Sequence, residues 1–212
     1  MGPELGAIFH ATSVELSWLH WRWKQYRILF GEKPSRINLL NQSAPFFFRV
    51  IQDALLEDTF LGIARLVGPS ASLNKPNLTI QRLPSLISNA SLRDEVQTLV
   101  RKAKTSAAFA DDWRNRHIAH RDLQLALDKS ARRLAVATRG KIEDSLSAMR
   151  EVLNHIEDSY CNAVTAYYSP SPGDAETLLY VLRDGLMRER DRRERWDRGE
   201  RHEDDLMPPE DI

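Results

Sequence analysis

The feature that most constrains this 212-residue chain is the spacing of its apolar residues. Several long stretches repeat apolar residues at intervals of three and four, and no stretch alternates apolar and polar side chains over the length of a strand. Intervals of three and four follow one face of an α-helix, whereas alternation follows one face of a strand. Glycine is scarce, at nine residues. We therefore predict an all-α fold, a bundle of about five helices with a charged C-terminal helix.

The first two helices have clear boundaries in the sequence. One is predicted over residues 13–30, where Gly31 follows the last apolar position of the stripe. The other is predicted to start at Ser43–Pro45, with the proline in the first turn, and to run to Gly68. Aromatic side chains dominate buried area, so we assign the tryptophans of the first helix to packing. These are Trp18, Trp21 and Trp23.

The second half of the chain is predicted to hold three more helices. After a loop rich in serine, asparagine and proline, one helix capped by Ser91 runs into the region of Trp113, which we also assign to packing. Another covers about 142–167, and the last follows the turn SPSPGD. We expect residues 1–170 to form the bundle and residues 171–212 to form a charged helix with a flexible tail. In that helix Glu189 precedes Arg193 by four residues, a spacing that stabilises an exposed helix.

Charge and cysteine content exclude several classes of protein. Thirty basic and thirty acidic residues cancel, so nucleic-acid binding requires a local patch rather than an overall field. The single cysteine, Cys161, cannot form an internal disulfide, and the N-terminus lacks the pattern of a secretory signal. A membrane-spanning helix needs about 20 mostly apolar residues, and apolar clusters such as Pro45–Phe48 are soon interrupted by charge. We expect a cytoplasmic protein without membrane contact.

The densest cluster of chemically active side chains is WRNRHIAHRD, residues 113–122. Arg114 and His120 are six positions apart, which on a regular helix is a rotation of roughly 240° and a rise of about 9 Å. They therefore do not share a helix face. For the two to act together, either the helix ends between them or a second copy of the segment completes the site.

This cluster carries a resemblance to a known family. Arg114-Asn115, then four residues, then His120 resembles the signature of HEPN domains, which are helical bundles. The longer form RNRHIAHRD is similar to the HEPN branch named after an abortive-infection (Abi, U-type) phage-defence protein. Further landmarks are WRWKQYRILFG, LLNQSAPFFFRVIQDALLEDTFLGIARLVGP and Asn77-Leu78. The resemblance covers roughly residues 13–165.

The resemblance implies a homodimer that brings two motifs together in a cleft and acts as a metal-independent endoribonuclease without a cofactor. Arg114 would bind the scissile phosphate, Asn115 would orient it, and His120 would transfer a proton. RNA supplies its own nucleophile, and histidine, with an ordinary pKa of about 6.5, suits both proton roles near neutral pH. The expected setting is phage defence or toxin-like stress control, with an antitoxin or other regulatory protein as a further partner.

Other residues near the motif are candidates for supporting roles. Arg116 and His117 lie inside the motif and can assist or compete with its ends, while Asp122 can orient His120 or pair with an arginine such as Arg116. The basic segment that follows is either an RNA-backbone contact or an ordinary solvated loop. Its members are Lys129, Arg132, Arg133, Arg139 and Lys141.

Two other readings of the motif stay open. In the first, Arg114 and His120 stabilise the dimer or a helix end, and the protein is a non-catalytic module that binds RNA or protein. In the second, His117 and His120 bind a divalent ion with one of the nearby aspartates (Asp111, Asp112, Asp122). No third histidine or glutamate stands at a convincing interval, so we expect no metal site.

Overall fold

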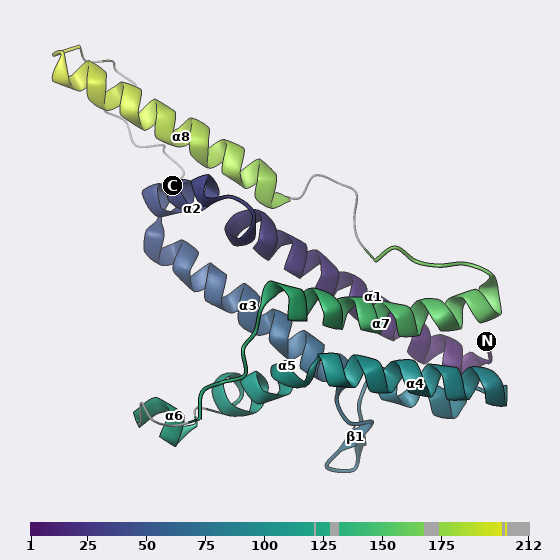
Figure 1. Cartoon of the computed structure of the whole chain (residues 1–212). Coiled ribbons are helices and arrows are strands. Elements are labelled where there is room, and N and C mark those ends of the chain that lie inside the picture. Colours follow the sequence, from purple (N-terminus) through teal and green to yellow (C-terminus); the bar gives the residue numbers. More distant parts are fainter. Residues whose placement is uncertain (121, 128–131, 168–173, 201, 203–212) are drawn as a thin grey trace. The chain divides into compact units, whose positions relative to one another are not determined.

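The computed structural model of the chain describes residues 1–120, 122–127, 132–167, 174–200 and 202. Helices form most of it (Figure 1). They are α1 (Pro3–Tyr26), α2 (Pro34–Ser43), α3 (Pro45–Val67), α4 (Ala90–Ser106), α5 (Ala108–Trp113), α6 (Leu123–Leu127), α7 (Arg139–Cys161) and α8 (Asp174–Asp197), with π-helical turns at Arg27–Gly31 and Arg114–Ile118 and 3-10 turns at Ile80–Arg82 and Pro84–Leu86. Strands β1 (Ala71–Ser72) and β2 (Lys75–Pro76) pair as a small antiparallel hairpin. The all-α prediction is confirmed.

There are more helices than the predicted five, for reasons that lie in the local backbone. The helix predicted from Ser91 to the region of Trp113 is divided at Ala107, whose φ and ψ of −88° and 1° depart from helical values. Its cap is Asn89 rather than Ser91, because the Asn89 side chain accepts the backbone N–H of Leu92 at 3.1 Å. The additional helix α2 begins at a proline in its first turn.

Two other helix boundaries differ from the predicted ones. The first helix begins at Pro3, ten residues earlier than predicted. The helix predicted over 142–167 ends at Cys161, because Asn162 takes a left-handed conformation with φ of 49° and closes the helix. In contrast, α3 begins at Pro45 and ends at Val67, as the sequence predicts.

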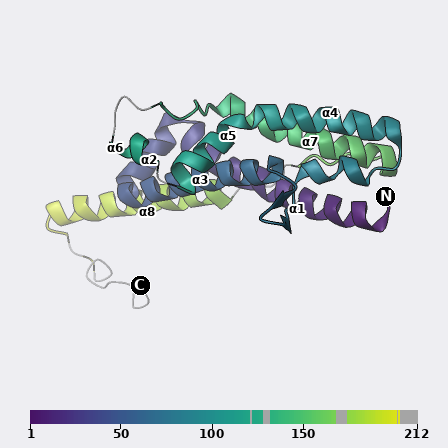
Figure 2. The same cartoon turned by 90° about the horizontal axis from the view of Figure 1, so that it is seen from below.

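The contacts divide the chain into two compact units, Met1–Trp23 with Ala54–Pro170, and Lys24–Asp53 with Ser171–Ile212. In the first unit α4 and α7 lie side by side, which both views show (Figures 1 and 2). Two ion pairs join these helices on the outside, Lys102 with Glu151 at 2.7 Å and His155 with Glu95 at 2.8 Å. The largest fully buried side chains of this unit are Leu16, Leu19, Phe60, Ile63, Val67, Ile80, Leu83, Leu146, Met149, Leu153 and Ile156.

In the second unit α2 and the π-helical turn at Arg27–Gly31 pack against α8. Arg36 joins these elements, because one amino group donates to the carbonyl of Ile28 at 2.9 Å and the other lies 3.3 Å from Glu176. Further along α8, Arg193 and Glu189 form the predicted ion pair at 3.0 Å.

The tryptophans of α1 do not all pack in the core. Trp23 is buried, but Trp18 is 54% exposed and meets Trp21 edge-on, with ring centroids 5.7 Å apart. The assignment of Trp18 to packing was therefore wrong, because its position on α1 lies off the stripe of Leu16 and Leu19 that faces the core. No helix in the described residues has both the length and the apolar character needed to cross a membrane.

Candidate functional site

The helix that carries the motif ends within it. After α5 the chain widens into the π-helical turn Arg114–Ile118, in which the backbone N–H of Ala119 donates to the carbonyl of Arg114 at 2.8 Å. The N–H of Asp122 then donates to the carbonyl of Arg116 at 3.1 Å. His120 lies two residues after Ile118, the last helical residue, and is exposed. Of the two arrangements that the spacing allows, the end of the helix between Arg114 and His120 is the one observed within a single chain.

Arg116 holds the turn and the following segment together. Its Nε donates to Asp122 at 3.0 Å, and one of its amino groups donates to the carbonyl of Arg132 at 2.7 Å. A third contact joins it to Asp112 at 3.6 Å, and only 18% of its side chain is exposed. Its guanidinium group is therefore used within the protein, and it is a structural residue of the site.

Asp122 pairs with Arg116 and also caps the next helix. Its Oδ1 accepts the backbone N–H groups of Gln124 and Leu125 at 3.0 and 3.2 Å, at the start of α6. The hydrogen bond from Arg116 lowers the pKa of the Asp122 carboxyl below its ordinary value, and these two N–H groups lower it further. Of the two roles that the sequence allowed for Asp122, the contacts show the pairing with Arg116.

Arg114 and Asn115 contact each other directly. The Nε of Arg114 donates to the side-chain oxygen of Asn115 at 3.0 Å, and one amino group of Arg114 lies 3.4 Å from Asp111. The remaining amino group has no contact with the residues that the structure describes. This hydrogen bond uses the amide oxygen of Asn115, so the amide nitrogen is the group of this side chain that can donate to a ligand.

His117 and Trp113 are partly buried and contact side chains of α3. The Nε2 of His117 lies 3.7 Å from a carboxyl oxygen of Glu57, and its ring meets Trp113 edge-on at 5.4 Å. Trp113 also contacts Phe60 at 5.1 Å and donates its indole N–H to the carbonyl of Ala135 at 2.8 Å. Trp113 is a packing residue, as predicted, and it ties the segment after α6 to α5.

His120 has a different environment from His117, the other histidine of the motif. It is exposed, and it forms no hydrogen bond or ion pair within the described ranges of the chain. No described carboxylate orients it.

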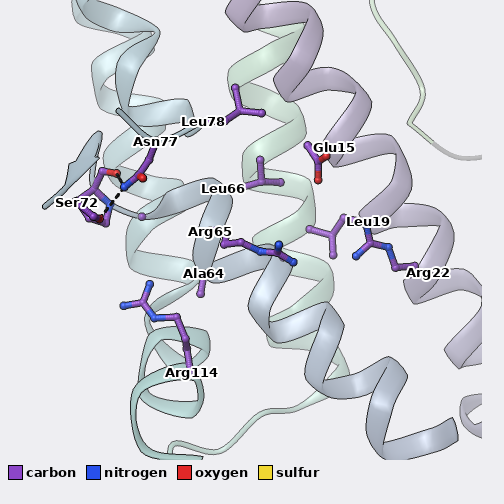
Figure 3. A pocket seen from close by; sticks show the side chains of 13 residues that line it. Glu15, Leu19, Arg22, Ala64, Arg65, Leu66, Ser72, Asn77, Leu78 and Arg114 are labelled. Atoms are coloured by element: carbon purple, nitrogen blue, oxygen red, sulfur yellow. Dashed lines mark hydrogen bonds between the residues drawn. The ribbon is translucent and has the colours of Figure 1, made fainter. Parts of the chain in front are cut away.

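Arg114 lines a pocket of about 540 Å³ (Figure 3). The pocket is formed by α1, the C-terminal end of α3, the hairpin segment and the π-helical turn of the motif. Arg22 and Arg65 lie in the same pocket, and both bind the carboxylate of Asp58. Sequence reasoning missed these two arginines as site residues, since they lie 92 and 49 positions before Arg114.

Asn115 lines a second, open depression of about 870 Å³. Three residues of the predicted basic segment lie there, namely Arg132, Arg133 and Lys141. Asp112 and Asp144 from neighbouring helices lie beside them, and Arg132 pairs with Asp112 at 2.6 Å. Arg139 instead pairs with Glu143 at 2.9 Å, and Lys129 lies outside the described residues.

The motif thus lies between two depressions, with Arg114 in one and Asn115 in the other. Within the part of the chain that is described, no group of three or more histidine, cysteine, aspartate or glutamate side chains is placed to hold a metal ion. The arrangement offers one cation for a phosphate and one exposed imidazole for proton transfer.

A helical bundle that ends one helix inside the sequence Arg-Asn-x4-His defines a protein of the HEPN class. The chain belongs to the AbiU2 family, because the HEPN_AbiU2 family model matches residues 2–178. This confirms the resemblance to the abortive-infection U-type branch. The match ends near the start of α8, so most of the charged helix lies beyond it. Comparison with curated proteins and with solved structures gave no match.

Proposed function

We propose that this abortive-infection HEPN protein is a metal-independent endoribonuclease whose active cleft forms between two copies of the chain. The observation that carries the proposal is that Arg114 and Arg116, both in the motif, make different contacts. Arg116 is used to hold the turn, whereas Arg114 lines a pocket with one amino group uncommitted among the described contacts. A guanidinium group in that position is suited to binding two oxygens of a phosphate.

The reaction follows from the chemistry of RNA. The 2′-hydroxyl attacks the adjacent phosphorus, the bond from phosphorus to the 5′-oxygen breaks, and the products are a 2′,3′-cyclic phosphate and a 5′-hydroxyl. One group must take the proton of the 2′-hydroxyl, and another must give a proton to the leaving oxygen. In this account Arg114 binds the phosphate, the amide nitrogen of Asn115 helps to orient it, and His120 transfers a proton.

The requirement for two proton-transfer groups supports a dimer. Each chain contributes one exposed histidine at the end of the motif, and no described carboxylate in the same chain orients it. Two copies related by a twofold axis would supply two copies of His120, one as acid and one as base. Arg132, Arg133, Arg139, Lys141 and the preceding Lys129 would contact the RNA backbone and make binding salt-dependent.

The biological setting that we propose is phage defence or toxin-like stress control. The family name supports the first of these. A nuclease active on cellular RNA needs restraint, so an antitoxin or another regulatory protein is a further expected partner.

A second candidate function is a non-catalytic HEPN dimer that binds RNA or protein through the same surface. It is favoured by the pairing of Arg114 with Asp111 at 3.4 Å and by the exposure of His120. In this case the two residues would contribute to the interface between copies rather than to a reaction.

One experiment separates the two functions. Purified wild type, His120→Ala and the control His155→Ala are each incubated with a labelled structured RNA in EDTA, while light scattering and circular dichroism report on dimerisation and helix content. His155 is a suitable control because it is a partly exposed histidine of α7, in contact with Glu95 and away from the motif. The nuclease predicts that His120→Ala alone abolishes cleavage and remains a folded dimer. Loss of the dimer in His120→Ala would support the structural role instead.

A further inference from the structure

The pocket that Arg114 lines contains a second cationic group, built from two arginines and one carboxylate. Arg22 donates to one oxygen of Asp58, and Arg65 lies 3.7 Å from the other. Figure 3 shows the guanidinium groups of Arg22 and Arg65 turned toward each other, while Arg114 lines the pocket from the π-helical turn with its guanidinium group pointing away from them. Because two arginines share one carboxylate, the formal charges of the three groups sum to +1.

Donors of this group remain for a ligand. Arg65 uses its Nε on the carbonyl of Leu61 at 3.3 Å and one amino group on Asp58, and its side chain is 63% exposed. Its other amino group has no contact with any residue that the structure describes. A guanidinium has five N–H donors in a planar fork, which matches the oxygens of a phosphate.

The rest of the pocket combines apolar side chains with hydrogen-bond acceptors. Leu78, which is 40% exposed, provides an apolar surface, whereas Leu19 and Leu66 line the pocket as buried core residues. The amide nitrogen of Asn77 donates to the carbonyl of Pro69 at 3.0 Å and to the hydroxyl of Ser72 at 2.8 Å, so its oxygen remains as an acceptor (Figure 3). Glu15 adds a carboxylate, also an acceptor.

We infer that this pocket binds one nucleotide of an RNA strand, next to the phosphate that Arg114 holds. The base lies against Leu78, its N–H groups meet the acceptors of Glu15 and Asn77, and its backbone phosphate binds Arg65 and Arg22. The volume of about 540 Å³ is within the range of about 300–1,000 Å³ of small-molecule sites, which combine apolar walls with a few polar groups. The inference rests on the proposed function, since that function assigns Arg114 to the cleaved phosphate.

The composition of the pocket favours a nucleotide over other anions. A simple inorganic anion would leave the exposed side chain of Leu78 without a partner. An acidic peptide would place carboxylates beside Glu15, and like charges at short distance repel each other. A nucleotide has an apolar ring face, N–H donors at the base edge and an anionic phosphate, and each of these has a counterpart in the pocket.

The test measures binding separately from cleavage. A fluorescent oligonucleotide with 2′-O-methyl riboses has no free nucleophile, so its anisotropy with the full-length protein in EDTA reports binding alone. The variants are Arg65→Gln and, as matched control, Arg49→Gln. Arg49 is also on α3, is 70% exposed and pairs with Asp53, but it does not line the pocket. We expect Arg65→Gln to weaken binding about tenfold, the loss of one charge-assisted contact, and Arg49→Gln to change it less than twofold.

A second pair of variants tests the apolar surface. Leu78→Glu places a negative charge inside the pocket, whereas Leu73→Glu places it on the neighbouring hairpin turn, where Leu73 is 97% exposed. We expect only Leu78→Glu to weaken binding. Crosslinking of a 4-thiouridine-containing oligonucleotide, mapped by mass spectrometry, should place the nucleotide among residues 62–78.

The outcomes separate this inference from the proposed function. Equal binding by Arg65→Gln and wild type would overturn the phosphate contact, and equal binding by Leu78→Glu and Leu73→Glu would overturn the base contact, even if the wild type cleaves RNA. Binding that depends on Arg65 and Leu78, in a protein that never cleaves RNA, would support the pocket and overturn the nuclease. Absence of oligonucleotide binding by the wild type would overturn both.

Discussion

The guanidinium of Arg116 donates to the carboxylate of Asp122 at 3.0 Å, across the turn that separates Arg114 from His120. The same side chain binds the carbonyl of Arg132 and thereby fixes the segment that follows α6. Two arginines that are neighbours in the motif therefore have different roles. Arg116 positions the chain around the site, and Arg114 lines the pocket.

Replacing either of these two arginines should lower the stability of the protein, but by different amounts. Arg116→Ala removes charge-assisted hydrogen bonds from a mostly buried group, so we expect the free energy of unfolding to fall by about 1–3 kcal/mol. Arg114→Ala removes one loose ion pair and one exposed hydrogen bond to Asn115, and it should cost less than about 1 kcal/mol. Urea denaturation measures both values. Equal losses for the two variants would contradict the division of roles.

The approach of α1 to α3 beneath the pocket depends on Gly62. A Cβ atom at this position would lie 2.8 Å from a methyl carbon of Leu19, which is fully buried and lines the pocket. We expect Gly62→Ala to destabilise the protein by about 1–3 kcal/mol, the usual cost of overpacking a core. Gly185→Ala is the control, because a Cβ there meets no atom within 4 Å.

Alanine has a higher helix propensity than glycine, so the control Gly185→Ala should stabilise α8 by about 0.5–1 kcal/mol. Thermal unfolding of the two variants beside the wild type gives the comparison. An unchanged melting temperature in Gly62→Ala would show that α1 and α3 are not held at this distance.

His20 should make stability depend on pH below neutrality. Burial, and then the positive charge of Arg150, lower the pKa of His20 to about 4, although a backbone hydrogen bond at Leu146 acts in the opposite direction. The ring stacks on Tyr167, with centroids 6.1 Å apart. Because the unfolded chain, with a pKa of about 6.5, binds the proton more readily, this contribution is complete above that pH and is lost as the pH falls toward 4.

The full loss amounts to no more than about 3 kcal/mol, and His20→Gln should remove this part of the pH dependence. Urea denaturation of wild type and variant at pH 7 and pH 5 measures it. The wild type should lose more stability than the variant between these two values. Equal losses would show that His20 does not titrate in this range.

Local signals in the sequence were sufficient for part of the fold. Pro45 and Gly68 mark the two ends of α3, because both act on the backbone next to them. The exposure of Trp18 follows from its position off the stripe of Leu16 and Leu19, whereas the break at Ala107 has no glycine or proline to mark it in the sequence.

Sequence patterns likewise predicted only part of the candidate site. The motif was located from its residues alone, and so was its place at a helix end. The roles of Arg114 and Arg116 became distinct only with their contacts, since both are arginines two positions apart. The pocket brings Arg22 and Arg65 to Arg114 through the packing of α1 and α3, and no spacing in the sequence predicts that.

The most direct test of the nuclease is the chemistry of the RNA ends that the wild-type protein leaves in EDTA. The account predicts cleavage with 2′,3′-cyclic phosphate and 5′-hydroxyl ends, and no cleavage at a position where a single 2′-deoxy nucleotide precedes the scissile phosphate. Cleavage that needs a divalent metal, or that proceeds at the deoxy position, would contradict it. So would a folded dimer that leaves every RNA intact.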